Sequence, residues 1–539
     1  RKGWCSMDRQ GRGGPRRPGG PGGPRRPASP GKPGAPNRGG RPGGPGGSGP
    51  AKPGEARRSF DKKPLKEGDR RQGGDRRQGG DHRPESPAPR RGGIDARRLA
   101  LNALGEVVRV KAYSTLALSE HLRAASHLTP EDKRLATVIF YAALENRIQI
   151  AWILKQFVQS MPEKVIEDIL HIAAAQILFL DRVPDHAAVN EAVGQVKSLG
   201  RERFAPLVNG ALRSLIRARD AGELHYPERE DDPIKYLSVM NSLPLVLATK
   251  LIEDYGLEEA ERMAAYRPGE RTQVIRPNLL RYTDKAFASY LDARRLPHER
   301  GTVPHAFHLT GAGDLGHDPD YKNGVFSIQG EGSMLAALAV APERGQNILD
   351  ACAAPGGKSA LICELMGLTG RVQAWEVHEH RVELLRATKD RLRLDNLRAL
   401  ARDSSIHRPD CDTAFDSVLI DAPCSGLGVM INKPDIKYRV TEDDIQSLTA
   451  LQARILEACA GYPRVGGRLV YATCTVLKDE NERQVRAFLD RHGEYALDPS
   501  DGWLPEALRP RLEGGMLQLQ AHIDGMEGFF IARMTRKRL

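Results

Sequence analysis

The sequence has few cysteines and no long apolar stretch, and both absences narrow the class of protein. Seven cysteines are spread over 539 residues; none forms a C-x-x-C pair and their number is odd. We therefore expect neither structural disulfides nor a metal cluster, and a reducing, cytoplasmic setting without a secretory signal. The longest apolar run, ILHIAAAQILFL from Ile169, is interrupted by His171 and Gln176 and is too short to cross a bilayer.

Two common nucleotide-binding patterns are missing from the Gly-rich loop DACAAPGGKSA, which begins at Asp350. A Walker A loop reads G-x-x-x-x-G-K-[ST]; Gly357, Lys358 and Ser359 match its end, but Cys352 stands where the first glycine belongs. The dinucleotide pattern G-x-G-x-x-G is absent as well. These departures argue against a P-loop nucleotidase and against a dinucleotide-binding loop.

Residues 1–93 contain almost no aliphatic side chains and consist largely of Gly, Pro and Arg, with the repeats GGPRRP and DRRQGG. Ordering such a segment costs entropy without apolar burial in return, so we predict a disordered tail. It carries 24 Lys and Arg against 8 Asp and Glu, a net charge of +16, whereas the rest of the chain carries −4. An arm of this kind suits non-specific attraction to RNA phosphates; the alternative is a solubilising extension without a dedicated partner.

Helical periodicity replaces this composition over residues 94–220, where apolar residues recur three and four positions apart and no strand pattern intervenes. Thr129 followed by Pro130 and two acids predicts a helix start. We expect an all-helical domain here. Residues 221–325 mix helical stretches with the strand-like TQVIRPN from Thr272, and are expected to form a small α+β linker module.

From residue 326 to 539, short apolar strands alternate with amphipathic helices. This order predicts an α/β domain with a doubly wound, mostly parallel sheet, closed by an antiparallel edge from MLQLQ and EGFFIARM. Ligands of such sheets bind beyond the carboxyl ends of the strands. The domain is therefore the expected place of any chemistry.

The cofactor can be inferred from groups at three successive strand ends. The DACAAPGGKSA loop offers free backbone amides at a helix start, which suit a carboxylate. Glu376 ends the second strand, where an acid can hold both hydroxyls of a ribose, and Asp403 after the third could reach an adenine amino group. A carboxylate at one end and an adenosine at the other indicate S-adenosylmethionine.

The motifs DACAAPGGKS, DAPCSGLG, NKPDIKY, YATCT and DGMEGFF occur in the order and spacing of RNA cytosine-5 methyltransferases, which the chain resembles. The run from Pro184 to Val193 is similar to NusB-like RNA-binding domains, although an ordinary helical bundle is the alternative. Together the two resemble the RsmB (Sun/Fmu) type over residues 94–539, with a Rossmann-like class I catalytic fold. The resemblance implies methylation of 16S rRNA, as protein-free RNA or an early assembly intermediate. We expect a monomer by default, and neither a membrane nor a metal as a partner.

By that resemblance Cys474 is the nucleophile and Cys424 assists release of the product. The implied cofactor contacts are Cys352, Ala353, Ala354, Pro355, Gly356, Gly357, Lys358, Glu376, Asp403 and Asp421. Three features depart from the usual pattern: Thr475 replaces Ser, Glu376 replaces Asp, and no Gly precedes Asp403.

The chemistry explains why a thiol is needed. Carbon-5 of cytosine is too electron-poor to attack a methyl sulfonium until a thiolate adds to carbon-6, and Cys combines nucleophilicity with easy departure. Asp421 can accept from the exocyclic amine of the base, which must leave its stack to reach this pocket. Lys433 and Lys437 are candidate phosphate contacts, with solvated surface lysines as the alternative.

Other interpretations remain open at this point. A free cysteine is most often a small buried hydrophobe, and we expect that role for Cys363, Cys411 and Cys459. A rival function is a NusB-like RNA- or transcription-complex-binding protein with an inactive catalytic half. The presence of both Cys424 and Cys474 argues against it.

Overall fold

The computed structural model describes residues 95–269 and 272–538, which belong to one compact unit of the chain. The predictions for residues 1–93 lie outside the described part. Within that part, no helix has both the length and the apolar composition needed to cross a bilayer.

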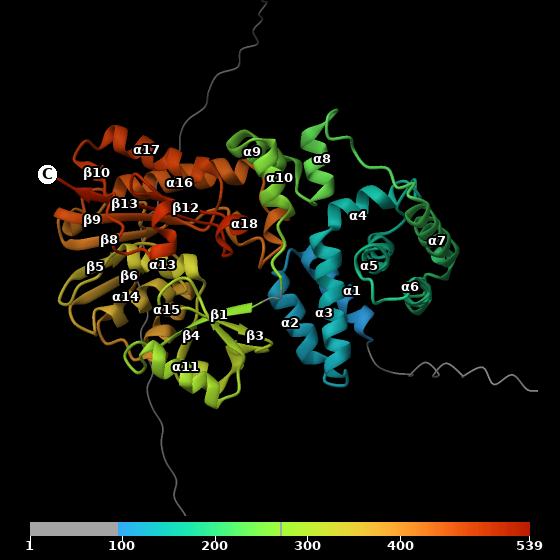
Figure 1. The fold of residues 1–539 in the computed structure, drawn as a ribbon, viewed down its shortest axis with the longest axis horizontal. Coiled ribbons are helices and arrows are strands. Elements are labelled where there is room, and N and C mark those ends of the chain that lie inside the picture. Colours follow the sequence, from blue (N-terminus) through green and yellow to red (C-terminus); the bar gives the residue numbers. More distant parts are fainter. Residues whose placement is uncertain (1–94, 270–271, 539) are drawn as a thin grey trace, which may run out of the picture. The chain divides into compact units, whose positions relative to one another are not determined.

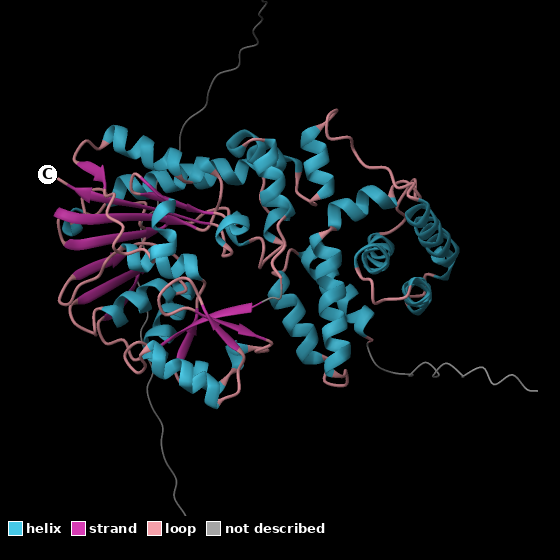
Figure 2. Ribbon diagram, in the orientation of Figure 1, coloured by secondary structure: helices cyan, strands magenta, loops and turns pink. Residues whose placement is uncertain are grey.

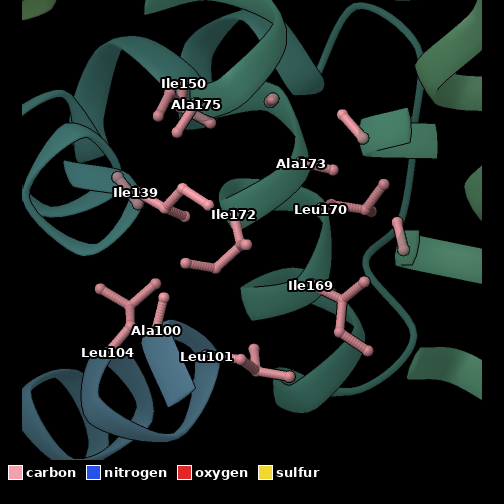
Figure 3. Packing of buried hydrophobic residues seen from close by; sticks show 14 of the residues in the cluster. Ala100, Leu101, Leu104, Ile139, Ile150, Ile169, Leu170, Ile172, Ala173 and Ala175 are labelled. Carbon is pink, nitrogen blue, oxygen red and sulfur yellow. The ribbon is translucent and has the colours of Figure 1, made fainter. Parts of the chain in front are cut away.

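Residues 96–221 fold into helices, as predicted (Figure 1). Helix α5 runs through their centre, and its apolar run packs on all sides. Figure 3 shows Ile169 and Ile172 of α5 among Leu104 and Ile139 from neighbouring helices. Thr129 caps α3 by accepting from the Asp132 amide at 3.1 Å. The helices are α1 (Ala96–Gly105), α2 (Ser114–Ala124), α3 (Pro130–Glu145), α4 (Arg147–Leu154), α5 (Lys164–Phe179), α6 (Asp185–Ser198) and α7 (Ala205–Ala221).

The segment expected as one linker module divides into two parts. Its first helices, α8 (Pro233–Met240), α9 (Leu245–Tyr255) and α10 (Leu257–Ala265), share a core with residues from 427 to 477 of the catalytic domain. The second part holds a four-stranded antiparallel sheet in the order β2-β3-β1-β4. Its elements are β1 (Thr272–Pro277), α11 (Asp284–Ala293), β2 (His298–Arg300), β3 (Phe307–Thr310), α12 (Pro319–Lys322) and β4 (Phe326–Ile328). Because β4 pairs with β1, the boundary expected after residue 325 falls too early.

The remaining residues form the predicted α/β domain (Figure 2). Its nine-stranded sheet has the order β11-β12-β13-β9-β8-β5-β6-β7, with β10 paired to β13. Strands β5 to β9 pair in parallel, and β13 adds the expected antiparallel edge. The strands are β5 (Asn347–Asp350), β6 (Arg371–Glu376), β7 (Leu397–Ala401), β8 (Phe415–Asp421), β9 (Pro463–Thr473), β10 (Tyr495–Leu497), β11 (Leu512–Glu513), β12 (Met516–Leu519) and β13 (Phe529–Arg536).

Helices cover both faces of this sheet, because its strands carry apolar side chains on both sides. Along β8, Leu419 belongs to one apolar cluster and its neighbours Val418 and Ile420 to the other. The helices are α13 (Glu331–Ala339), α14 (Gly357–Leu365), α15 (Glu379–Leu392), α16 (Glu442–Cys459), α17 (Glu482–Arg491) and α18 (Ala521–Asp524).

The strand order reverses beside β5, with β6 and β7 on one side and β8 and β9 on the other. Asp350, Glu376 and Asp421 are the last residues of β5, β6 and β8, and Cys474 directly follows β9. Parallel strands present their carboxyl ends at one edge, so the topology brings the predicted residues together.

Candidate active site

Two thiols face each other at the carboxyl ends of β8 and β9. The Sγ atoms of Cys424 and Cys474 lie 3.4 Å apart, although the residues are fifty positions apart in sequence. Both side chains are partly exposed, whereas Cys363, Cys411 and Cys459 are buried as expected. An open cavity of about 380 Å³ reaches Cys424 from beside the start of α16.

The surroundings distinguish the two thiols. The hydrogen bond with Cys424 lowers the pKa of Cys474; burial and the charge of Asp421 act against this, and the ammonium groups of Lys358 and Lys433 lower the pKa further. The pKa of Cys424 is raised well above its usual value, first by the hydrogen bond to Cys474, then by burial and by the charge of Glu480. The surroundings therefore favour the thiolate more at Cys474 than at Cys424, as a nucleophile needs.

An ion pair lies beside the thiolate. Lys358 Nζ, in the first turn of α14, is 2.6 Å from Asp421 Oδ2 at the end of β8, and it also lies over the Phe529 ring. Burial lowers the pKa of Lys358, but Asp421 outweighs this effect and the pKa is raised overall. The ammonium thus stays charged next to Cys474, and Asp421 keeps a second oxygen that can accept from a ligand.

The backbone of the loop between β5 and α14 is fixed by hydrogen bonds to neighbouring segments. Ala353 N donates to Trp375 O, and the Ser404 hydroxyl donates to Ala351 O. Gly356 has φ 109°, which favours glycine, and an added Cβ would lie 3.0 Å from Leu385. The first amides of α14 follow directly and have no acceptor within the helix.

Acidic side chains surround this loop at three strand ends. Asp350 is buried; Ser359 donates to one of its oxygens, the other has no partner, and burial raises its pKa to about 7. Glu376 is buried at the end of β6, where Arg381 Nη1 lies 3.0 Å away. Asp403 is exposed beyond β7 and accepts from the Ser405 amide and hydroxyl.

These groups fit S-adenosylmethionine. Free amides suit its carboxylate, the unpartnered Asp350 oxygen suits its ammonium, and Glu376 suits its ribose hydroxyls. Asp350 and Arg381 were not among the predicted residues. Asp350 opens the quoted motif and could have been found there, whereas Arg381 reaches the Ala354 carbonyl from α15 without any sequence pattern.

The two lysines expected to contact phosphate have different surroundings. Lys433 is exposed and close enough to lower the pKa of Cys474. Lys437 is buried, and its Nζ donates to Glu145 O at 2.9 Å and Asn241 O at 3.4 Å. Its Nζ is occupied by carbonyls at the ends of α3 and α8, so the expectation of a phosphate contact is wrong for Lys437.

A buried carboxylate behind the thiols was also missed. Glu480 accepts hydrogen bonds from the Ser425 amide and from the Gln452 side chain, and it is fully buried. Neither its spacing from Cys474 nor its local sequence indicates this position.

Comparisons with known proteins identify the family and the fold. The profile of the family described as 16S rRNA methyltransferase RsmB/F matches residues 337–535, and that of the NusB family matches residues 94–217. A Bacillus subtilis protein described as "Probable ribosomal RNA small subunit methyltransferase B" is 35% identical, over 82% of this chain and 98% of its own. The Shewanella oneidensis "Ribosomal RNA small subunit methyltransferase B" is 30% identical, over 82% and 99%. The solved structure of PH0851 matches the fold with a TM-score of 0.68 at 24% identity, over 82% of this chain and 98% of its own.

Proposed function

The chain belongs to the RsmB/F family of 16S rRNA methyltransferases, which use S-adenosylmethionine, and from this membership we propose that it methylates carbon-5 of a cytosine in 16S rRNA through a covalent bond to Cys474. The observation that carries the proposal is the thiol pair: two sulfur atoms 3.4 Å apart, with the pKa of Cys474 lowered and that of Cys424 raised by their surroundings.

The residues suggest the following sequence of steps. The Cys474 thiolate forms a bond to carbon-6, and the electrons of the 5,6 double bond make carbon-5 nucleophilic enough to accept a methyl group. S-adenosylmethionine, when bound, supplies that group as an electrophile. Carbon-5 then loses its proton to a base, the sulfur–carbon bond breaks, and the thiolate is restored. Asp421 orients the base through its exocyclic amine, and Cys424 assists release of the product.

The remaining surfaces fit RNA as the substrate. The NusB-family match covers the helical domain, and Lys433 places an exposed positive charge near the thiolate, where the phosphate of a flipped-out nucleotide could lie. We further propose protein-free or early assembly-stage rRNA as the form acted on, a monomeric enzyme, and a cytoplasmic setting.

The test uses the full chain with radiolabelled S-adenosylmethionine and protein-free 16S rRNA. We expect label on carbon-5 of cytosine, and no transfer by Cys474→Ala. Cys424→Ala should instead accumulate a protein–RNA adduct that survives denaturing electrophoresis. The Cys411→Ala variant, which lacks a buried thiol outside the site, is the matched control.

Each part of the proposed function can be contradicted by a separate result. Binding of RNA without transfer by the native chain would favour the inactive, RNA-binding alternative. Label on a base other than cytosine would remove the carbon-5 chemistry. A Cys424→Ala variant that turns over normally would remove the release role.

A further inference from the structure

The steps proposed above give no role to Glu480, a fully buried carboxylate near the two thiols. Glu480 lies in the short helical turn Lys478–Glu480 after β9, is fully buried, and none of its hydrogen-bond partners is a cation. Burying a carboxylate costs several kcal/mol unless its oxygens are well satisfied. What satisfies Glu480 is the loop that carries Cys424.

One oxygen of Glu480 accepts from the Ser425 amide at 2.9 Å and from Gln452 Nε2 at 3.0 Å; the other accepts from the Ser425 hydroxyl. Gln452 also donates to Pro423 O at 2.9 Å. The residues before and after Cys424 are thus both tied, directly or through Gln452, to one carboxylate.

The loop after β9 is tied to the same group. Because the Ser425 hydroxyl donates to Glu480, the 2.8 Å contact between Ser425 Oγ and Thr475 Oγ1 is a donation from Thr475. Thr475 directly follows Cys474 and is fully buried. A single chain of hydrogen bonds therefore joins the residue after each thiol and ends on Glu480, which explains why position 475 keeps a hydroxyl.

The charges around the two thiols also differ. The hydrogen bond to Cys474 and burial raise the pKa of Cys424, and the charge of Glu480 raises it further; Tyr471 of β9 lies near the same group. At Cys474 the charge of Asp421 raises the pKa, whereas Lys358 and Lys433 lower it.

We propose that Glu480 is a positioning residue of the reaction: its carboxylate fixes the loops after β8 and β9 in register, so that Cys474 rather than Cys424 is presented as the nucleophile. This assignment rests on the proposed covalent function. It gives the two chemically identical thiols different roles through a residue that touches neither substrate nor cofactor.

The test compares Glu480→Gln with Glu482→Gln, a nearby carboxylate that is partly exposed. Iodoacetamide is applied to the full chain without RNA or cofactor between pH 6 and 9.5, and alkylation of each cysteine is followed by peptide mass spectrometry. We expect Cys474 to react about tenfold faster than Cys424 at pH 7 in the native chain. In Glu480→Gln this preference should fall about fivefold or more, and the Cys424 profile should move to lower pH.

Single-turnover methyl transfer by Glu480→Gln should fall about tenfold or more with little change in KM for RNA. Glu482→Gln should behave as the native chain in both measurements. A Glu480→Gln variant that keeps the native alkylation preference and rate would overturn the proposal. Because alkylation needs no RNA, it decides the role of Glu480 even if the native chain transfers no methyl group to cytosine.

If Glu480→Gln does not fold, Ser425→Ala, Thr475→Val and the double variant replace it. Each interrupts the same chain of hydrogen bonds, so the double variant should lose no more activity than the worse single variant. Ser425→Ala retains the charge of Glu480 and should keep the alkylation preference for Cys474. Additive losses, or a lost preference in Ser425→Ala, would overturn the proposal.

Discussion

At the scale of single residues, the site separates two identical functional groups by what surrounds them. Cys424 feels the carboxylate of Glu480, whereas Cys474 feels the carboxylate of Asp421 together with the ammonium groups of Lys358 and Lys433. Lys358 is held by Asp421 at 2.6 Å, whereas Lys433 is exposed. The exposed lysine therefore offers the cleaner test of how charge stabilises the thiolate.

Replacing Lys433 by Met removes a positive charge beside Cys474. The thiolate loses part of its stabilisation, so the pKa of Cys474 rises and more of the thiol is protonated at neutral pH. We expect the acid limb of log kcat/KM against pH to move to higher pH by a few tenths of a unit, about the effect of one exposed charge.

The control is Lys433→Arg, which keeps the charge and should keep the native acid limb. An unshifted limb in Lys433→Met, together with a weaker dependence of KM on salt, would make Lys433 a phosphate contact only.

Whether a site residue could be predicted from the sequence depends on how its position is determined. Asp421 ends a predicted strand, Cys424 and Cys474 lie just beyond strand ends, and Lys358 is in the first turn of the helix after β5, so topology brings all four to one edge. Glu480 could not be predicted, because its partner Ser425 is 55 positions away and a buried carboxylate is identified only by the donors around it.

At the scale of elements, the segment 428–438 joins the site to the helical domain. At the start of this segment, Gly428 N donates to Cys474 O at 2.9 Å. At its end, Tyr438 Oη donates to Leu144 O at 2.9 Å and Lys437 Nζ to Glu145 O. These donors satisfy the last carbonyls of α3, which a helix cannot satisfy itself. Sequence periodicity predicted α3, but not which residues of another domain would cap it.

Lys437 should make stability depend on pH. Burial lowers its pKa to about 7, against about 10.4 in the unfolded chain. Between these values the unfolded chain binds the proton that the native protein does not, so this group makes stability rise with pH over that window. In Lys437→Met that contribution disappears, and the urea midpoint should rise less from pH 7 to pH 9.5.

Lys197→Met, at an exposed position of α6, is the control and should keep the native slope. A native slope in Lys437→Met as well would show that the ammonium stays charged across the window, held by its two carbonyl acceptors.

At the scale of the whole molecule, the domains are joined by polar contacts that composition and periodicity do not reveal. The sequence predicted the order of the domains and the α/β sheet, because apolar spacing reports local structure. The predicted boundary assigned β4 to the catalytic domain instead of the small antiparallel sheet, since a three-residue strand is too short to show an alternation of apolar residues. One such link is a buried ion pair that no sequence pattern indicates: Arg276 of β1 and Glu364 of α14 lie 2.7 Å apart, with both side chains fully buried.

Breaking this pair from one side should be costly, because it leaves an uncompensated charge in the interior. We expect Arg276→Met or Glu364→Gln to lower the free energy of unfolding by about 3–5 kcal/mol, measured by urea denaturation, and the double variant to recover part of the loss. Arg294→Met breaks partly exposed pairs with Asp318 and Asp320 and should cost about 1 kcal/mol or less. Since α14 begins at the cofactor loop, both single variants should also bind S-adenosylmethionine more weakly in calorimetry. Losses that simply add in the double variant would show that the two charges stabilise the junction independently, through Gln329 and the Leu279 amide, rather than through each other.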